Sequence, residues 1–401
     1  MFKAILSYSN FKAAYLEIVE QFAADHRNFR YHGLDNIFLR DFDLKSQKII
    51  KQARADLLER KEIEPALSVL IPKPNKPEEF REIFIYNLKE RIKAQAIYRV
   101  VLPEFEKNFS DRLLSYRPGR PPYLAARIFC RHYRKEFRGD QALVIDAKNY
   151  SDRIDREMMS AQLEKIFPDK KVLGLLRLFV FNQVYRQGVS ETPAKGLVQG
   201  VPLIALFANL YLADLDFKYQ VQADFYIRVG DDIALLDHDP VKLSAIKEAL
   251  LRDLQARGLE INEKKLFLGA AEEPFSFLGY AFQAGTIGLE SGFVKKVVDG
   301  WKNILTYQHK TLREKKRLLA KIMNRVDSNF NYQFQKIIKT KCQINDTAQV
   351  KKMSEKFFAI LTRFMYEHYS PRQRRLLEDV LSEFKITSLY KTYNNFHYDR
   401  R

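Results

Sequence analysis

The sequence holds 401 residues, 46% of them hydrophobic and 13% aromatic, which is enough to bury the cores of about two to three folding units. Its 68 Lys and Arg residues exceed its 50 Asp and Glu residues by 18, and such a surplus must lie on the surface, where it favours binding to a polyanion. No apolar run approaches the roughly 18 residues of a membrane-spanning helix, and the N-terminus lacks the pattern of a signal peptide. Composition therefore predicts a globular, cytoplasmic protein whose partner is nucleic acid or an anionic membrane surface.

Helices and a hairpin are the first elements expected along the chain. Apolar residues at helical spacing over residues 11–22 and 49–58 predict an α-helical lead-in, interrupted by a polar, turn-rich stretch around residues 25–35. Two apolar runs within residues 69–85 flank the basic loop sequence PKPNKPEEFR. This pattern predicts a β-hairpin with a basic tip.

The middle of the chain, residues 141–282, alternates short apolar runs with helical patterns. The runs ALVID, FYIRV, IALL, LFL and FLGYAF are typical of strands. Helices are expected over residues 156–166, 203–215 and 240–257. The mixture predicts an α+β layer in which helices pack on a small sheet.

Beyond residue 300 the strand patterns stop. Helices are expected over residues 301–323, 347–369 and 371–384, with Ser370-Pro371 separating the last two. Residues 299–401 hold 22 Lys and Arg against 10 Asp and Glu, so 12 of the 18 surplus charges lie in this quarter of the chain. Both a solvated helical face and a surface that follows a polyanion fit this composition, and the uneven surplus favours the polyanion.

Three aspartates form the candidate metal site. Asp146 ends the apolar run ALVID, and Asp231 and Asp232 stand in a Gly-Asp-Asp turn between the runs FYIRV and IALL. Gly and Asp suit a hairpin turn on structural grounds alone. Two adjacent carboxylates nevertheless repel each other by about 4 kcal/mol at about 4 Å and an effective dielectric near 20, and a divalent cation relieves that repulsion. The pattern therefore predicts a metal site.

Two further segments accompany the aspartates. In KGLVQGVPLIALFANLYLADLD, Gly200 permits close approach of the backbone to a ligand and Gln199 offers an amide for hydrogen bonding. In FSFLGYAF, a glycine between aromatic residues predicts a pair of strands.

In their order along the chain, these segments resemble the palm motifs of bacterial reverse transcriptases of the group II intron type and of their phage-defence relatives. The resemblance spans roughly residues 34–285, and a C-terminal part stands in the place of the helical thumb. The matching motifs are Ile71-Pro72-Lys73 with Arg81, Ser115-Tyr116-Arg117-Pro118-Gly119-Arg120, Asp146-Ala147-Lys148, Gln199-Gly200-Val201-Pro202, Gly230-Asp231-Asp232 and Phe277-Leu278-Gly279-Tyr280.

The resemblance implies an α+β, right-hand polymerase fold with fingers and palm and an α-helical, thumb-like C-terminal domain. It divides the chain into a helical lead-in over residues 1–60, fingers over 61–140, a palm with the catalytic site over 141–285, and a basic thumb-like domain over 293–401.

The resemblance also implies two-metal nucleotidyl transfer. Asp146 and Asp231, with the backbone carbonyl of Ala147, would hold two Mg²⁺ ions, for which Mn²⁺ can substitute. Asp232 would be the supporting carboxylate. These residues are the expected catalytic and metal-binding groups.

Four residues are expected to contact the incoming nucleotide. Lys73 and Arg81 would bind the triphosphate, arginine through its planar fork and lysine as a point charge. Gln199 would bind through its amide. Tyr150 falls where the family places the aromatic residue that blocks a 2′-hydroxyl, and core packing explains this tyrosine equally well.

Three residues depart from the family pattern. Val229 stands where an aromatic residue usually precedes the acidic pair, Ser151 replaces a second aromatic residue next to Tyr150, and Val201 replaces a small residue in the Gln-Gly loop. None of them removes a metal ligand. We expect catalysis with unusual use of template or primer.

Two other functions stay open. RNA-dependent RNA polymerases also carry a Gly-Asp-Asp triplet, and the sugar of the incorporated nucleotide separates them from reverse transcriptases. A catalytically inactive RNA-binding scaffold with a polymerase fold is the alternative from another class, although three retained carboxylates are useless to it.

The resemblance also names partners. These are an RNA template, a DNA product, deoxynucleoside triphosphates and, as in antiviral defence relatives, a dedicated non-coding RNA. No membrane is expected. The sequence leaves open the primer, a homo-oligomer and a partner protein.

Overall fold

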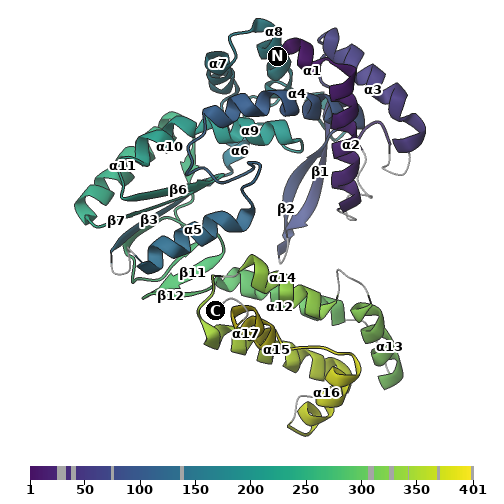
Figure 1. The fold of residues 1–401 in the computed structure, drawn as a ribbon, viewed down its shortest axis with the longest axis vertical. Helices are drawn as coiled ribbons and strands as arrows, with labels where there is room; N and C mark the ends of the chain where they lie inside the picture. Colours follow the sequence, from purple (N-terminus) through teal and green to yellow (C-terminus); the bar gives the residue numbers. More distant parts are fainter. Residues whose placement is uncertain are drawn as a thin grey trace. The chain divides into compact units, whose positions relative to one another are not determined.

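The computed structural model describes residues 1–24, 33–37, 42–73, 76–135, 140–305, 311–324, 329–341, 343–367 and 371–398. By its internal contacts the chain divides into two compact units. Unit 1 comprises residues 1–121 and 143–268, and unit 2 comprises residues 122–142 and 269–401. Figure 1 labels the helices and the longer strands of both units. Among the described residues, no helix is long and apolar enough to cross a membrane.

Unit 1 begins with helices around one long central helix. The helices α1 (Phe2–Ile5), α2 (Tyr8–Ala24) and α3 (Phe42–Leu58) contact α4 (Leu88–Lys107). Their apolar faces are buried in one hydrophobic core that extends through unit 1. The predicted helical lead-in is therefore helical where it is described, and its turn-rich stretch lies largely outside the described residues.

A four-stranded sheet follows, in the order β2-β1-β4-β5. The predicted hairpin is confirmed as β1 (Ala66–Lys73) and β2 (Lys76–Ile85), which pair antiparallel. The short strands β4 (Val184–Arg186) and β5 (Val189–Glu191) were not predicted, and β4 pairs parallel with β1.

The second sheet of unit 1 has the order β6-β7-β3-β8, and a fifth strand pairs with β3. This order makes β7 the neighbour of β3, so two strand ends that are far apart in the sequence meet at one edge of the sheet. The strands are β3 (Gln141–Lys148), β6 (Phe225–Val229), β7 (Asp232–Asp237), β8 (Glu260–Ile261) and β9 (Phe267–Ala270).

Six helices accompany these strands, and one of the predictions is corrected. Residues 203–215, expected as one helix, form α9 and α10, which are separated at Leu212, where φ is −116° and ψ is 8°. The apolar pattern of the sequence continues through this break of one residue, so the sequence did not reveal the break. The helices are α6 (Tyr150–Arg153), α7 (Arg156–Ile166), α8 (Lys170–Val180), α9 (Pro202–Tyr211), α10 (Ala213–Tyr219) and α11 (Pro240–Ala256).

Unit 2 combines one helix and a small sheet with a helical C-terminal part. The helix is α5 (Pro122–Lys135). The antiparallel sheet contains β10 (Phe275–Phe277), β11 (Tyr280–Gln283) and β12 (Thr286–Leu289), which confirms the strand pair expected in FSFLGYAF. Aromatic rings of α5, β10 and β11 pack together, with Phe129 and Phe282 at 5.2 Å between ring centroids.

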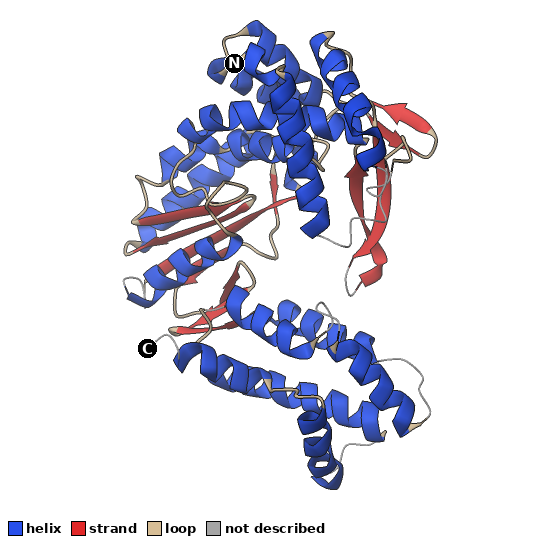
Figure 2. Ribbon diagram, turned by 45° about the vertical axis from the view of Figure 1, so that its right-hand side comes forward, coloured by secondary structure: helices blue, strands red, loops and turns tan. Residues whose placement is uncertain are grey.

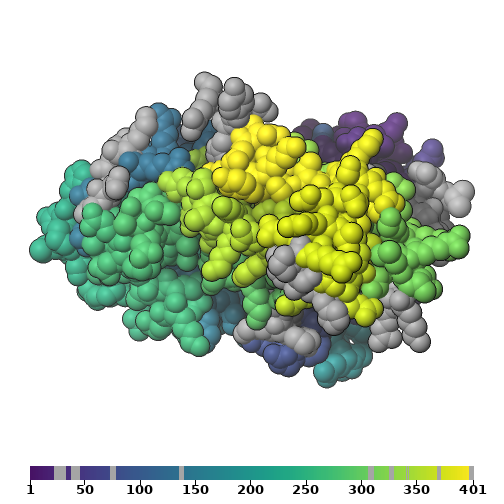
Figure 3. Space-filling view, turned by 90° about the horizontal axis from the view of Figure 1, so that it is seen from below, coloured from purple at the N-terminus to yellow at the C-terminus, as the bar shows by residue number. Residues whose placement is uncertain are grey.

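After β12 all of the elements in the described residues are helices, as expected (Figure 2). The single helix predicted over residues 301–323 is wrong, because α12 ends at Leu305 and a separate helix begins at Leu312 with a capping box formed by Thr311 and Glu314. Two further helices were not predicted, α14 and α17. The helices are α12 (Ser291–Leu305), α13 (Leu312–Met323), α14 (Phe330–Thr340), α15 (Thr347–Tyr366), α16 (Pro371–Glu383) and α17 (Leu389–Tyr398). Figure 3 shows the side chains of the last of these helices in yellow.

Candidate active site

Asp146 lies near the end of β3, and the residue is 7% exposed. The residues before it in the strand, 142–145, are buried, so apolar packing fixes the strand that carries it. Asp146 Oδ1 accepts a hydrogen bond from Asn262 Nδ2 at 3.1 Å, and Oδ2 accepts one from Lys265 Nζ at 2.6 Å. The backbone amide of Asn262 also donates to the Asp146 carbonyl at 2.9 Å. This carboxylate is therefore held both by its strand and by the turn that follows β8.

The Gly230-Asp231-Asp232 turn joins β6 to β7, and β7 is the neighbour of β3. The backbone amide of Ala147 donates to the Asp231 carbonyl at 3.4 Å, which places the turn beside Asp146. Burial raises the pKa of Asp231, and the charge of Asp146 raises it further. Burial also raises the pKa of Asp232, to which the charges of Asp231 and Asp146 add. The structure thus brings together the three carboxylates that the sequence pattern singled out.

Asn262 and Lys265, which contact Asp146, were not predicted as site residues. Burial alone would lower the pKa of Lys265, but the hydrogen bond to Asp146 and the charges of Asp232 and Asp231 outweigh it, and the pKa is raised. The ammonium group therefore offsets part of the repulsion within the acidic cluster. The signal in the sequence was a basic pair, Lys264-Lys265, in the polar stretch between two apolar runs.

The donors at this site suit a hard divalent cation. Three carboxylates and the backbone carbonyl of Ala147 are oxygen ligands, which Mg²⁺ prefers. Burial is the main cause of the raised pKa of Asp232, and a cation would relieve the further contribution from the charges of Asp231 and Asp146. In the described part of the chain, however, no three Asp, Glu, His or Cys side chains stand close enough to cage a metal ion. Lys265 Nζ contacts one Asp146 oxygen instead. Metal binding would need the Lys265 ammonium group to withdraw from Asp146.

The Gln-Gly loop lies against β2. Gln199 is exposed, and Gly200 has φ +127° in a place where a Cβ atom would lie 2.7 Å from the Phe84 carbonyl oxygen. Val201 is 6% exposed, and Pro202 is the first residue of α9. The loop is therefore fixed by close contact that glycine alone permits, and it leaves the Gln199 side chain accessible.

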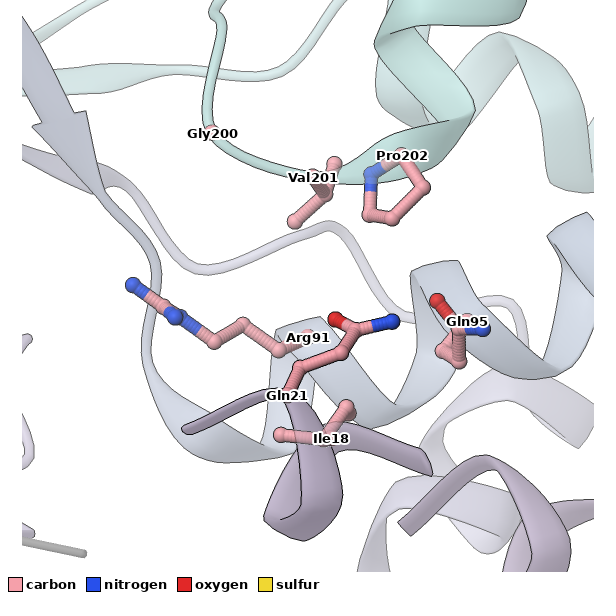
Figure 4. A pocket seen from close by; sticks show the side chains of 7 residues that line it. All are labelled: Ile18, Gln21, Arg91, Gln95, Gly200, Val201 and Pro202. Carbon is pink, nitrogen blue, oxygen red and sulfur yellow. The ribbon is translucent and has the colours of Figure 1, made fainter. Parts of the chain in front are cut away.

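A cavity of about 120 Å³ adjoins this loop. Figure 4 shows side chains of α2 and α4 on one side and the loop on the other. Gln95 is 3% exposed; its Nε2 donates to Glu17 Oε2 at 2.6 Å, whereas its Oε1 accepts no hydrogen bond from the described residues. The cavity therefore presents a buried acceptor to whatever small polar group or water enters it. Its lining residues are Ile18, Gln21, Arg91, Gln95, Gly200, Val201 and Pro202.

The other predicted nucleotide-binding residues lie at separate places in unit 1. Arg81 is exposed on β2 and pairs with Ile71. Burial raises the pKa of Asp152, and the charge of Arg81 offsets part of that rise. Lys73 ends β1, and its side chain lies outside the described residues. Tyr150 is 5% exposed, and its hydroxyl donates to the Ala208 carbonyl at 2.5 Å. Such burial agrees with core packing, and the roles of all three residues stay predictions.

With this geometry in place, one comparison decides the family. The sequence profile described as "Reverse transcriptase (RNA-dependent DNA polymerase)" matches residues 71–282, more than half of the chain. The chain belongs to the reverse transcriptase family. The predicted fold class is thereby confirmed, since reverse transcriptases have the α+β, right-hand polymerase fold and the C-terminal part is helical. All of the predicted site residues lie within the matched range.

Solved telomerase structures are similar to this reverse transcriptase family member at low identity. Apo telomerase from Candida tropicalis, truncated from its C-terminal domain, is 14% identical over 63% of this chain, with a TM-score of 0.43, and the chain spans 61% of that structure. A second apo telomerase from Candida tropicalis gives 11% identity, coverage of 89% and 68%, and a TM-score of 0.47. Candida albicans telomerase, in complex with a fragment of telomeric RNA, is 12% identical over 85% of this chain and 68% of that structure, with a TM-score of 0.45. No curated protein sequence matches the chain significantly.

Proposed function

We propose that this protein is an RNA-directed DNA polymerase that joins deoxynucleotides on an RNA template. The observation that carries the proposal is the meeting of Asp146, near the end of β3, with Asp231, in the turn before β7, and Asp232, the first residue of β7, within a reverse transcriptase domain. Bound Mg²⁺ would supply the positive charge that favours deprotonation of the primer hydroxyl and departure of pyrophosphate. Asp146, Asp231 and the Ala147 carbonyl would hold it, with Asp232 in support.

The remaining site residues would position the substrates. Gln199, exposed on a loop fixed against β2, would donate to the nucleotide through its amide. Arg81 and Lys73, on the β1–β2 hairpin, would bind the triphosphate. Tyr150 would exclude a 2′-hydroxyl by lying under the sugar. In this assignment residues 61–140 act as fingers, 141–285 as palm and 293–401 as a thumb.

The biological role we propose is antiviral defence in bacteria, with a companion non-coding RNA as template. Its support is the resemblance of six motifs to group II intron-type reverse transcriptases and their phage-defence relatives. Sequencing of the nucleic acid that co-purifies with the protein tests this role. Recovery of one abundant RNA with complementary DNA is expected, and recovery of unrelated cellular RNA would count against it.

The polymerase proposal is tested by primer extension beside a binding assay. Asp146→Ala and Asp231→Ala should each abolish incorporation, because both carboxylates act on the same metals, and the double variant should be hardly worse than either. Nucleic-acid binding should persist, since its affinity comes from many Lys and Arg contacts. Folding is checked by thermal melting.

Two outcomes would replace this proposal. A wild-type protein that incorporates no nucleotide on any template, including co-purified RNA, would be the binding scaffold. A wild-type protein that incorporates ribonucleotides in preference to deoxyribonucleotides would be an RNA polymerase with the same fold.

A further inference from the structure

A fully buried ion pair lies beneath the Gly-Asp-Asp turn. Arg228 on β6 and Asp216 on α10 are each 0% exposed. Arg228 Nε donates to Asp216 Oδ1 at 2.6 Å, and Nη2 donates to Asp216 Oδ2 at 2.6 Å, so the two side chains meet through a two-point contact. The Tyr226 hydroxyl donates to the same Oδ1 at 2.7 Å. The two bonds to Asp216 therefore fix the plane of the Arg228 guanidinium group.

The remaining contacts of this pair lead to Gly230, the first residue of the turn. Arg228 Nη1 donates to the Gly230 carbonyl at 3.0 Å, and the Gly230 amide donates to Ser115 Oγ at 2.8 Å. Both backbone polar groups of Gly230 are thus bound by buried side chains. Asp231 follows directly in the chain.

Asn209 on α9 connects Ser115 and Arg228, the two side chains that bind Gly230. Ser115 Oγ donates to Asn209 Oδ1 at 2.9 Å, and Asn209 Nδ2 returns a bond to the Ser115 carbonyl at 2.8 Å. Arg228 Nη2 also donates to the Asn209 carbonyl at 2.8 Å. Asn209 is 1% and Ser115 6% exposed, so water does not compete for these bonds. We call Ser115, Asn209, Asp216 and Arg228 the Gly230 network.

We infer that the Gly230 network positions the Asp231 and Asp232 carboxylates for metal binding, an inference that rests on the proposed polymerase function. Its four members are positioning residues. Arg228 and Ser115 bind the backbone of Gly230, and Asp216 and Asn209 hold Arg228 and Ser115 in place. Asn209 lies on the helix that begins at Pro202, directly after the Gln-Gly loop. The network therefore joins the turn, the Ser115–Arg120 motif and α9, the helix that follows the Gln-Gly loop, through one set of hydrogen bonds.

Stability alone does not explain such a network. A buried ion pair contributes little net stability, and well-packed apolar residues often replace one without loss. The turn is not strained and does not need the network to hold its conformation. Gly230 has φ +65°, which glycine adopts readily, and nothing lies within 4 Å of its Cβ position. What the network adds is a fixed position for the turn, which a metal site needs.

The experiment compares two serines that are matched in burial and bonding. Ser115 accepts one backbone amide and donates to one side-chain amide. Ser110, 1% exposed, likewise accepts the Arg112 amide at 3.0 Å and donates to Gln220 Oε1, away from the turn. Ser115→Ala and Ser110→Ala should lower the melting temperature of the full chain by similar amounts.

The two variants should differ in metal use. Ser115→Ala should lower kcat by roughly tenfold to hundredfold, as small misplacements of reacting groups do, with a smaller change in KM for the nucleotide. It should also raise the Mg²⁺ concentration for half-maximal incorporation and weaken Mn²⁺ binding in calorimetric titration. Ser110→Ala should leave all of these unchanged, and Ser115→Thr, which keeps the hydroxyl, should restore them.

Equal metal affinity and equal Mg²⁺ dependence in the two alanine variants would overturn the inference. Where Ser115→Ala does not fold, Ser115→Cys keeps the size of the side chain with a weaker hydrogen-bonding group and takes its place. If the wild-type protein incorporates no nucleotide, the proposed function fails, and Mn²⁺ titration of the same variants still decides the inference.

Discussion

Tyr150 carries two interpretations that one pair of substitutions separates. Its ring is buried and its hydroxyl donates to the Ala208 carbonyl. As a sugar gate, Tyr150→Val should raise ribonucleotide use relative to deoxyribonucleotide use, about tenfold for each 1.4 kcal/mol of lost steric clash. Tyr150→Phe keeps the ring and should keep the selectivity. The measurement is competitive incorporation of the two nucleotide classes. Unchanged selectivity in Tyr150→Val, together with a lower melting temperature, would mean that the ring serves only packing.

Lys341 in unit 2 is expected to make stability depend on pH. Its Nζ donates to the Leu278 carbonyl at 2.6 Å and lies 4.4 Å from the centroid of the Tyr280 ring. Burial lowers the pKa of Lys341 from 10.5 to about 8. Between these two values the unfolded chain keeps a proton that the folded chain has lost, so this residue's contribution to stability rises with pH in that window and is lost as pH falls through 8.

Substitution of Lys341 tests whether the free energy of unfolding rises with pH in this window. Lys341→Met should flatten the rise in the free energy of unfolding between about pH 8 and pH 10.5, measured by denaturant titration at several pH values. Lys339→Met, at an exposed position on α14, is the control and should leave the profile as in the wild type. A Lys341→Met profile that keeps the wild-type slope would show that another group titrates there.

Which site residues the sequence could predict depends on where their partners lie. Asp231 and Asp232 are adjacent, and Asp146 ends an apolar run, so local pattern was sufficient to select them. Asn262 and Lys265 are brought close to Asp146 because β8, which precedes them, pairs with β3. With only two residues, β8 has no detectable apolar pattern. Arg228 did carry a signal that was not used, since a charged residue within the apolar run FYIRV has to find a buried partner.

At the scale of elements, the loop before α9 depends on one glycine. Gly200→Ala should displace the Gln199–Pro202 loop from β2, because φ +127° and a contact of 2.7 Å to the Phe84 carbonyl both exclude a Cβ atom. We expect a higher KM for the nucleotide and a lower kcat in primer extension. Gly174→Ala in α8, where nothing lies within 4 Å, is the matched control and should raise stability by about 1 kcal/mol with activity unchanged. Normal nucleotide kinetics in Gly200→Ala would separate this loop from the substrate.

The helical and strand elements differed in how well the sequence specified them. The β1–β2 hairpin and helices such as α7 were predicted correctly, because the period of the apolar residues and the positions of the turn residues indicated the same elements. The helix predicted over residues 301–323 failed because its apolar spacing continued past Leu305, whereas Thr311 and Glu314 begin a new helix by capping its first turn. Strands β4 and β5 have three residues each, too few for a period to show, and the pairing of β4 with β1 is set by tertiary contact.

At the scale of the whole molecule, charge is the property that varies most along the chain. Residues 299–401 carry 12 of the 18 surplus positive charges. Within unit 2, a groove of about 670 Å³ lies against α13 and α16, with Arg313, Lys316 and Arg317 on one side. Glu383, its acidic residue, pairs with Lys316 at 2.5 Å. The exposed arginines Arg313 and Arg317 are therefore the groups of this groove best placed to neutralise phosphates.

Salt dependence of binding tests this placement. For a duplex, the slope of log affinity against log salt is about −0.9 for each phosphate neutralised, so Arg313→Gln with Arg317→Gln should make the slope shallower by up to about 1.8. Lys165→Gln with Lys170→Gln removes two exposed charges from unit 1 and is the control for net charge. The measurement is fluorescence anisotropy with a template–primer duplex between low and moderate salt, with folding checked by thermal melting. If both pairs of substitutions change the slope equally, binding responds to total charge alone. If the arginine pair leaves the slope unchanged, the groove does not contact the duplex, and the surplus charge of this region is a solvated face.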